Sequence, residues 1–414
     1  MAIIKAFRGL HPKQEFASQV ASPPYDVLSS DEAREIVKDN SNSFLRVNKS
    51  EVDFTPEDSK DTEKVFQKGK ENLHRLIDEG IMVRDEKESF YLYRLTMNGK
   101  SQTGIVARTS VDEYDRGLIK KHEHTRPVKV NDRADHIMTL EAQVGPVLSI
   151  FRQNKSIKSL FSKVTTSAPY IDFVAVDNIR HELWIVDSPD MVQSLIAEFD
   201  KLDSLYIADG HHRSEAASEV CRRMKEKNSS HTGNESYNYF LNVIFPDDEL
   251  SIMSYNRVIS EMQNLSMVEI IEKLSDKFEI EKSDTVVDPK DRHIIGIYHD
   301  KIWYKAVIKE GSYNDEHPVD SIDSAILTQN FLAPLFQIEN LRTDDRIDFV
   351  GGIRGTKELE KMVDSGNYKM AFALSPVTVE QLLAVADAGE VMPPKSTWFE
   401  PKLRSGMVVS LLSD

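Results

Sequence analysis

The stretch SLYIADGHHRSEAASEVCRRMKEK (204–227) decides the fold. Residues 204–209 form a short apolar run typical of a buried strand, and the pattern over 214–227 is helical. A strand that passes almost directly into a helix leaves the first helical N–H groups exposed at the turn, where the helix dipole favours negative charge. The stretch therefore predicts a strand–turn–helix unit that is suited to binding an anion.

The residues of this turn carry suitable chemistry for a phosphate. Gly210 lets a ligand approach the backbone closely, and the Arg213 guanidinium can donate two parallel hydrogen bonds to phosphate oxygens. His211 and His212 can donate to a phosphate, accept a proton or hold a metal. Asp209 can orient a histidine, bind a metal or accept a hydroxyl proton. The alternative is a plain strand-end turn that Asp209 caps, with both histidines in solvent.

Outward from this unit, strands, helices and hairpins alternate along the chain. Hairpin signals stand at Asn98–Gly99, Asp177–Asn178 and His299–Asp300, and FLRV (44–47) is a further strand candidate. So many hairpins favour an α+β protein with mixed sheets and interwoven domains over a doubly wound parallel sheet. The regions that we expect are 1–145, 146–260 and 261–414.

Composition excludes several classes of function. The 414 residues hold 52 Lys and Arg against 68 Asp and Glu, a net charge of −16, which opposes non-specific binding of nucleic acid. The single cysteine, Cys221, cannot form an intramolecular disulfide, and this suits a reducing cytoplasm. No run of 18 apolar residues is present to span a membrane. We therefore expect a cytoplasmic protein that acts on small molecules.

A second polar segment is KKHEHTRPVKVNDR (120–133). Glu123 is a candidate general base or metal ligand beside His122, and Arg133 can donate to an anion. Asp132 is the expected N-cap of the following helix. The alternative is a polar loop of charge pairs, and the spacing identifies no metal.

Two proline-stiffened loops complete the candidates. MPPKSTWFEPKLRSG (392–406) groups Lys395, Ser396 and Thr397, which suit a phosphate, although the chain has no Walker A pattern. SPPYDV (22–27) holds Tyr25 and Asp26 at a turn. Each loop can instead be a structural connection.

Taken together, SPPYDV, KHEHTRP, IADGHHR and MPPKSTWFEPKLRSG resemble, in this order, the bacterial and archaeal family called domain of unknown function 1015, over nearly the whole chain. The DGHHR stretch alone is similar to the nucleotide-phosphate motif of the ParB/sulfiredoxin superfamily, which includes the free L-serine kinases. This second resemblance implies a nucleotide-binding core with large insertions, in which residues 210–213 contact phosphate and an acidic residue acts as base.

We therefore expect nucleotide-dependent phosphoryl transfer to a small hydroxylated metabolite, with free L-serine as one case and with ATP or ADP and Mg²⁺ as cofactors. Glu123 is the first choice of base, ahead of Asp209 and Asp26. The alternatives are a metabolite phosphatase that uses His211 or His212 as acid or base, and a non-catalytic nucleotide-binding regulator. The expected site residues are Glu123, Asp209 and His212 for catalysis, Gly210, His211, Arg213, Arg133, Lys395, Ser396 and Thr397 for the cofactor, and Tyr25, Asp26 and His122 for the substrate.

Overall fold

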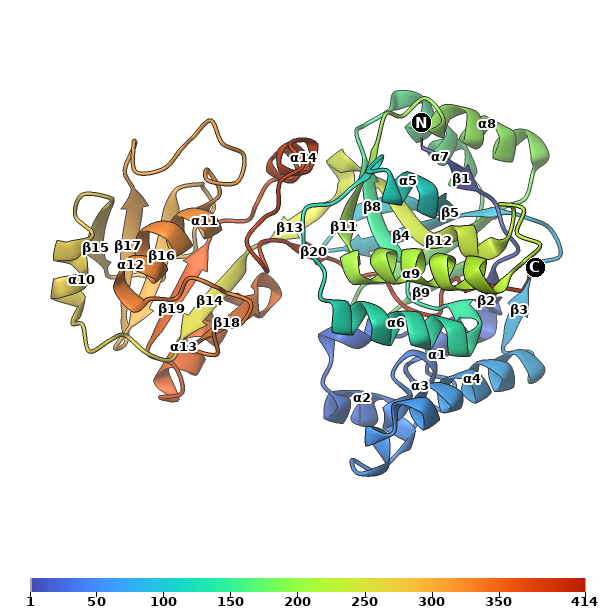
Figure 1. Ribbon diagram of the computed structural model, residues 1–414, viewed down its shortest axis with the longest axis horizontal. Helices are drawn as coiled ribbons and strands as arrows, with labels where there is room; N and C mark the ends of the chain where they lie inside the picture. The colour runs from blue at the N-terminus through green and yellow to red at the C-terminus, as the bar shows by residue number, and fades with distance from the viewer. Residues whose placement is uncertain (1, 414) are drawn as a thin grey trace. The chain divides into compact units, whose positions relative to one another are not determined.

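A computed structural model describes residues 2–413, which divide into two compact units. Of the described residues, unit 1 comprises 2–250 and 401–413, and unit 2 comprises 251–400. The colours of Figure 1 show the discontinuity, because the red C-terminal end of the chain lies in the same unit as the blue N-terminal part. The three expected regions differ from these units: the position 145–146 falls inside unit 1, and 260–261 falls inside unit 2.

Unit 1 is built on a mixed nine-stranded sheet. Its central strands pair antiparallel, whereas β11 with β6 and β12 with β8 pair parallel. In spatial order the strands are β6 (Ile119–Lys120), β11 (Leu205–Asp209), β8 (Val147–Phe151), β12 (Tyr239–Pro246), β5 (Lys100–Ser110), β4 (Phe90–Met97), β10 (Arg180–Val186) and β9 (Ile171–Val174), with β1 (Ile4–Lys5) beside β5. Two small pairs join β2 (Leu10–Pro12) to β3 (Met82–Arg84) and β7 (Ala142–Gln143) to β21 (Ser410–Leu411).

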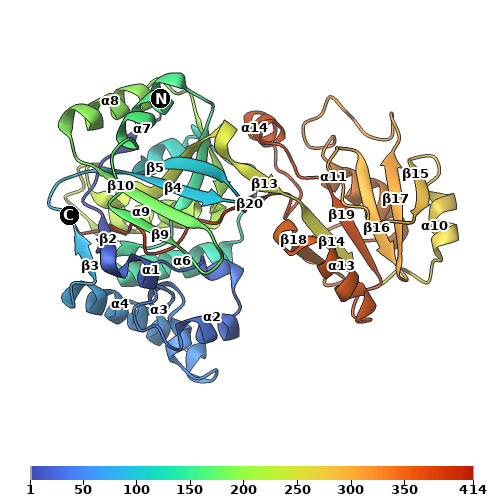
Figure 2. The same ribbon diagram turned by 180° about the vertical axis from the view of Figure 1, so that it is seen from behind.

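Some helices of unit 1 contact this sheet, and others pack on those helices. Figures 1 and 2 show α9 and α6 side by side, and the apolar residues Val130, Ala134, Ile137, Ala216 and Val220 pack between them. The helices are α1 (Ala17–Val20), α2 (Ser30–Val37), α3 (Leu45–Asn48), α4 (Thr62–Asp78), α5 (Val111–Asp115), α6 (Pro127–Leu140), α7 (Lys155–Val164), α8 (Pro189–Phe199) and α9 (His211–Lys227).

Unit 2 is an antiparallel six-stranded sheet with helices on both faces. Along β19, Met370, Phe372 and Leu374 enter one core while Ala371 and Ala373 enter the other, the alternation that a strand imposes. The sheet order is β15 (Phe278–Ser283), β17 (Ile302–Ile308), β16 (Ile294–His299), β19 (Met370–Leu374), β14 (Tyr255–Ile259) and β18 (Ile347–Gly351), and β13 (Ser251–Met253) pairs with β20 (Trp398–Glu400). The helices are α10 (Met267–Lys273), α11 (Asp323–Leu327), α12 (Ala333–Phe336), α13 (Gly355–Asp364) and α14 (Val379–Asp387).

The predicted α+β class with mixed sheets is confirmed, and so are the three hairpins. The strand predicted at 44–47 is wrong, because Leu45–Asn48 forms the short helix α3. Phe44 and Val47, three residues apart, enter one core cluster and Leu45 enters another, which is helical rather than alternating spacing. Arg46 donates to the carbonyl oxygen of Val37 and to the carboxylate of Asp53. None of the described helices is long and apolar enough to cross a membrane.

Candidate functional site

The β11–α9 turn is tighter than the sequence indicates. The helix begins at His211 rather than at residue 214, so Gly210 itself is the N-cap, with φ +97° and no side-chain cap. A Cβ on Gly210 would lie 3.3 Å from the Cα of Val147 on β8. A side chain there would be strained by φ and crowded by the sheet. The sequence thus places the N-terminus of a 17-residue helix directly after a buried strand, a place suited to an anion.

Asp209 closes β11 beside this helix N-terminus. Its carboxylate accepts a hydrogen bond from the Nζ of Lys402 at 3.1 Å, and the two side chains are 35% and 19% exposed. Burial acts to raise the pKa of Asp209, but the charges of Lys402 and Arg213 outweigh it and hold that pKa below its usual range. Asp209 is therefore an anion whose position is fixed by a lysine.

Lys402 is a site residue that the sequence reasoning missed. It lies in the quoted segment 392–406, but the prediction of a phosphate-binding lysine there named Lys395, because Lys395 is followed by two hydroxyl residues. Lys395, Ser396 and Thr397 belong to unit 2, where the Lys395 ammonium lies 5.7 Å from the centre of the Tyr255 ring. Lys395 and Ser396 contact residues of unit 2, and a role for the three residues at the phosphate stays a prediction.

Arg213 brings the SPPYDV loop to the turn. It donates to the carbonyl oxygen of Pro146 at 2.6 Å and to Asp26 at 2.9 Å. Burial acts against its charge, but Asp26 and Asp209 hold its pKa above the ordinary value. Tyr25 lies in the 3₁₀ turn Tyr25–Val27, with its ring centre 5.8 Å from the Arg213 guanidinium carbon. Two motifs that are far apart in the sequence are therefore neighbours in the fold.

Arg133 joins the same cluster from α6. Its guanidinium carbon lies 4.5 Å from the centre of the Tyr25 ring, and it donates to Asp132 at 2.7 and 2.9 Å. Asp132 was expected to cap this helix and does not, because α6 already begins at Pro127. The helix begins at the proline, six residues earlier than a cap at Asp132 would place it, and Asp132 serves as the partner of Arg133 instead.

The two histidines nearest the turn are buried and neutral. The rings of His122 and His211 meet edge to face with centres 4.5 Å apart, and the backbone N–H of His122 donates to the His211 Nε2 at 3.4 Å. Burial lowers the pKa of His122 to about 4, and burial together with the neighbouring His122 lowers the pKa of His211 well below its ordinary value. At neutral pH these rings supply hydrogen bonds rather than positive charge.

Glu123 and His212 each contact one of the two segments that meet here. One carboxylate oxygen of Glu123 is 3.8 Å from the Nδ1 of His211, and the Glu123 side chain is 35% exposed. The Nε2 of His212 accepts a hydrogen bond from the backbone N–H of Arg126 at 3.1 Å. The KHEHTRP segment therefore runs along the start of α9, where Glu123 faces both solvent and the helix N-terminus.

A small pocket opens beside Arg213, and two side chains on its wall carry unpaired polar atoms. It measures about 30 Å³ and is lined by Tyr25, Arg133 and Arg213 together with Asn48 and His136. Both amide atoms of Asn48 and the Nε2 of His136 lack a hydrogen-bond partner among the described residues, although these side chains are only 4% and 3% exposed. Buried polar groups are nearly always paired, so this pocket is built for a polar guest, water or a ligand. No sequence motif marked either residue.

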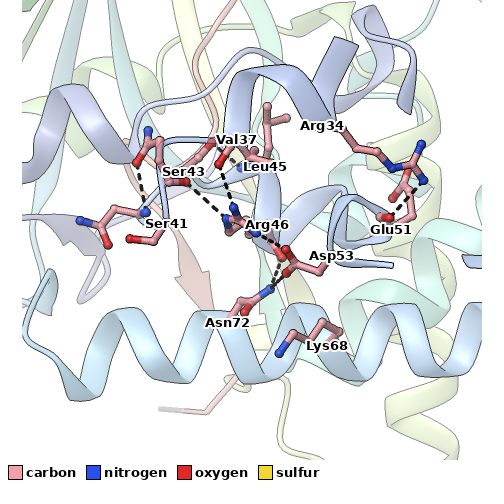
Figure 3. Close-up of polar contacts among 12 residues, drawn as sticks. Arg34, Val37, Ser41, Ser43, Leu45, Arg46, Glu51, Asp53, Lys68 and Asn72 are labelled. Atoms are coloured by element: carbon pink, nitrogen blue, oxygen red, sulfur yellow. Dashed lines mark hydrogen bonds and ion pairs between the residues drawn. The ribbon is translucent and has the colours of Figure 1, made fainter. Parts of the chain in front are cut away.

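The scaffold that holds Asn48 is itself polar (Figure 3). Arg46 donates to the carbonyl oxygen of Val37 at 2.8 Å and pairs with Asp53, which also accepts from Asn72 of α4 at 2.8 Å. Burial, helped by the charge of Arg133, lowers the pKa of His136 to about 3, and the His136 ring bonds the backbone of Val47. The neutral His136 therefore presents an acceptor nitrogen to the pocket.

These features define a class of protein: an α+β protein with a turn suited to an anion, flanked by carboxylates and by a small pocket that holds unpaired polar atoms. A sequence profile of the family described as Protein of unknown function (DUF1015) matches residues 4–325, and the chain belongs to that family. The family predicted from the four motifs is confirmed. A search of curated proteins finds no match.

Several solved structures are similar to this chain at low scores. A free serine kinase in complex with AMP is 12% identical, covers 72% of this chain and 86% of its own, and has a TM-score of 0.36. SbnI with a C-terminal truncation from Staphylococcus aureus is 11% identical, with 75% and 89% covered and a TM-score of 0.37. A conserved hypothetical protein from Pyrococcus furiosus is 15% identical, with 74% and 95% covered and a TM-score of 0.34. Similarity at this level carries no inference about activity.

Proposed function

We propose that this chain binds a nucleoside phosphate at the β11–α9 turn and transfers its terminal phosphoryl group to a small hydroxylated metabolite. The observation that carries the proposal is the convergence of Asp209, Arg213 and Lys402 at the N-terminus of a helix whose N-cap is Gly210. Phosphoryl transfer requires mostly positioning and charge stabilisation. Helical N–H groups, a guanidinium and an ammonium are donors of the required kind.

Glu123 is the proposed base. The metabolite hydroxyl oxygen attacks the terminal phosphorus, and the bond from that phosphorus to its bridging oxygen breaks. The nucleotide leaves with the electron pair, and the hydroxyl proton passes to the carboxylate. Glu123 lies at the first turn of α9, with one carboxylate oxygen 3.8 Å from the His211 Nδ1 and with its side chain 35% exposed. Asp209 and Asp26 are bound by Lys402 and Arg213. A carboxylate bound by a cation is the weaker base.

The pocket of Asn48 and His136 is the proposed seat for the polar part of the metabolite. The Asn48 amide can both donate and accept, and the His136 Nε2 accepts, which together match a hydroxyl or an ammonium group. Arg213 and Tyr25 line both this pocket and the phosphate turn, so a guest in the pocket would lie next to the transferred group. Free L-serine is one metabolite that carries both a hydroxyl and an ammonium group.

The test is an assay of the full chain with Mg²⁺, ATP or ADP, and a panel of small hydroxylated metabolites that begins with L-serine. We expect phosphorylated product by ³¹P NMR. Arg213→Gln and Glu123→Gln should each lose about 10²-fold or more in rate, and the matched Arg222→Gln on the outer face of α9 should not. Phosphate release from phosphoserine without nucleotide would favour a phosphatase instead. Binding without any turnover would leave a nucleotide-binding regulator.

A further inference from the structure

Unit 2 contains a buried arginine without an acidic partner. Arg257 of β14 is 1% exposed and donates to two backbone carbonyl oxygens, those of Tyr255 and of Lys395, the latter at 3.2 Å. Its Nε has no hydrogen-bond partner among the described residues. Burial lowers the pKa of Arg257 to about 10, against a smaller opposing effect of Tyr255. A buried charge that lacks a counter-charge destabilises a fold strongly, so the position calls for an anion.

Arg257 lines a small pocket with polar walls. Arg292, Asp323, Ser324, Ser375 and Ser396 line the same pocket, and the three serines are buried. The enclosed space is about 10 Å³, enough for one water-sized group. It therefore fits a single oxygen atom, either of a water molecule or of a ligand that extends outward.

The hydroxyl-bearing MPPKST loop forms part of this wall. The Ser396 hydroxyl donates to the carbonyl oxygen of Pro393 at 2.7 Å and lies 2.9 Å from the hydroxyl oxygen of Ser324. The Lys395 carbonyl oxygen holds Arg257 in place. The loop that the sequence marked as suited to phosphate is thus attached to the buried arginine of its own unit.

The charge balance of the pocket favours an anion. Asp323 is the one carboxylate among the lining residues, and it is already engaged: its oxygens accept from the His293 backbone N–H at 2.9 and 3.1 Å and from the Ser375 hydroxyl at 2.6 Å. Arg257 and Arg292 contribute two positive charges against this one. The free Nε–H of Arg257 can complete a guanidinium fork of the kind that binds carboxylate and phosphate.

We infer that this pocket of unit 2 is an oxyanion site, in which Arg257 anchors one oxygen of a phosphate or carboxylate group of a small molecule. The site does not depend on the phosphoryl transfer proposed for unit 1. Its residues are all contributed by unit 2, and a bound anion would give the Arg257 guanidinium the acidic hydrogen-bond partner that it lacks among the described residues.

The test uses the full chain with Arg213→Gln, which removes the anion-binding arginine of unit 1. Inorganic phosphate and acetate are titrated separately at constant ionic strength, and hydrogen exchange is followed in peptides that cover 321–326 and 392–398. We expect saturable protection of both peptides, and the anion that acts at the lower concentration identifies the ligand class. Adding Arg257→Met should weaken the effect at least about tenfold. Arg346→Met, which removes an arginine already paired with Asp344, should leave it unchanged.

Two further variants keep the test decisive if Arg257→Met does not fold. Ser396→Ala and Arg292→Gln each remove one pocket donor and should weaken protection about two- to tenfold. Two results would overturn the inference: equal protection in the Arg257→Met chain, or no protection by either anion up to about 100 mM, which would mean that the pocket holds water only. Loss of nucleotide turnover in unit 1 has no bearing on either result.

Discussion

The ion pair between Lys402 and Asp209 gives the sharpest prediction, because it ties the C-terminal return of the chain to the β11–α9 turn. Replacing Lys402 with Gln keeps much of the side-chain length and removes the charge 3.1 Å from the carboxylate. The charge of Arg213 then remains to stabilise the ionised Asp209 carboxylate. We expect a less stable unit 1 and weaker binding of nucleotide.

The magnitude follows from the exposure of the pair. Removing one partner of a fully buried pair costs about 3–5 kcal/mol. Asp209 is 35% exposed, so water screens part of the lost interaction, and we expect about 1–2 kcal/mol in the free energy of unfolding at pH 7. The loss should shrink as the pH falls through the folded-state pKa of Asp209, because a carboxyl with a depressed pKa stabilises the fold only while it is ionised.

Denaturant unfolding of unit 1, read by hydrogen exchange in the β11 and α9 peptides, measures the change. Lys201→Gln, at the end of α8 and paired with Glu198 on the surface, is the matched control and should shift stability by less than about 0.5 kcal/mol. A double-mutant cycle with Asp209→Asn should return a coupling energy of about 1–2 kcal/mol. A coupling energy near zero would refute the ion pair, and unchanged nucleotide affinity in Lys402→Gln would refute its place in the site.

Three further predictions concern the same unit. Gly210→Ala should destabilise it by about 1–3 kcal/mol and weaken nucleotide binding, whereas Gly233→Ala, with a similar φ of +92° but open space around it, should leave binding intact; equal binding by both variants in calorimetry would contradict the crowding argument. Because the folded-state pKa of His122 is about 4 against 6.5 in the unfolded chain, its contribution of about 3 kcal/mol is lost as the pH falls from 6.5 to 4, and His122→Gln should flatten a stability–pH curve over that window. Asn48→Ala should change the melting temperature little, because its amide has no protein partner, yet should raise the metabolite KM about tenfold or more; an unchanged KM would remove Asn48 from the pocket's function.

The sequence predicted the local units well wherever one segment carried the signal. The strand of 204–209, the hairpin at Asn98–Gly99 and the glycine turn each follow from a short pattern whose periodicity or turn chemistry has one solution. The strand predicted for 44–47 is wrong because four apolar and basic residues fit either a strand or a helical turn. The partners that Arg46 finds in the helical turn, the carbonyl oxygen of Val37 and the carboxylate of Asp53, come from other segments of the chain.

The site was predicted in part for the same physical reason. Asp209, Gly210 and Arg213 lie within five residues of one another, so the sequence alone predicts that they are close together. Lys402 reaches Asp209 only because the chain returns to unit 1 at residue 401. No short sequence pattern predicts that the chain returns there. Asn48 and His136 are visible only as unpaired atoms on the wall of a pocket, a property that does not exist before the chain is folded.

The charges of the site point to the form in which a nucleotide would bind. Each of its three cations already holds a carboxylate: Arg213 holds Asp26, Lys402 holds Asp209, and Arg133 holds Asp132. A bare nucleotide must compete with these carboxylates for the cations, and it is repelled by them. If the nucleotide arrived with Mg²⁺, Asp209 and Asp26 would be the carboxylates that could help to hold the metal, and Arg213 and Lys402 could then donate to the phosphate oxygens. We therefore expect Mg²⁺ to tighten ADP binding by about tenfold or more in titration calorimetry, and Asp209→Asn with Asp26→Asn to remove most of that gain. If ADP bound with the same affinity in EDTA as in Mg²⁺, the three ion pairs would stay intact on binding, and their role would be to stabilise the fold.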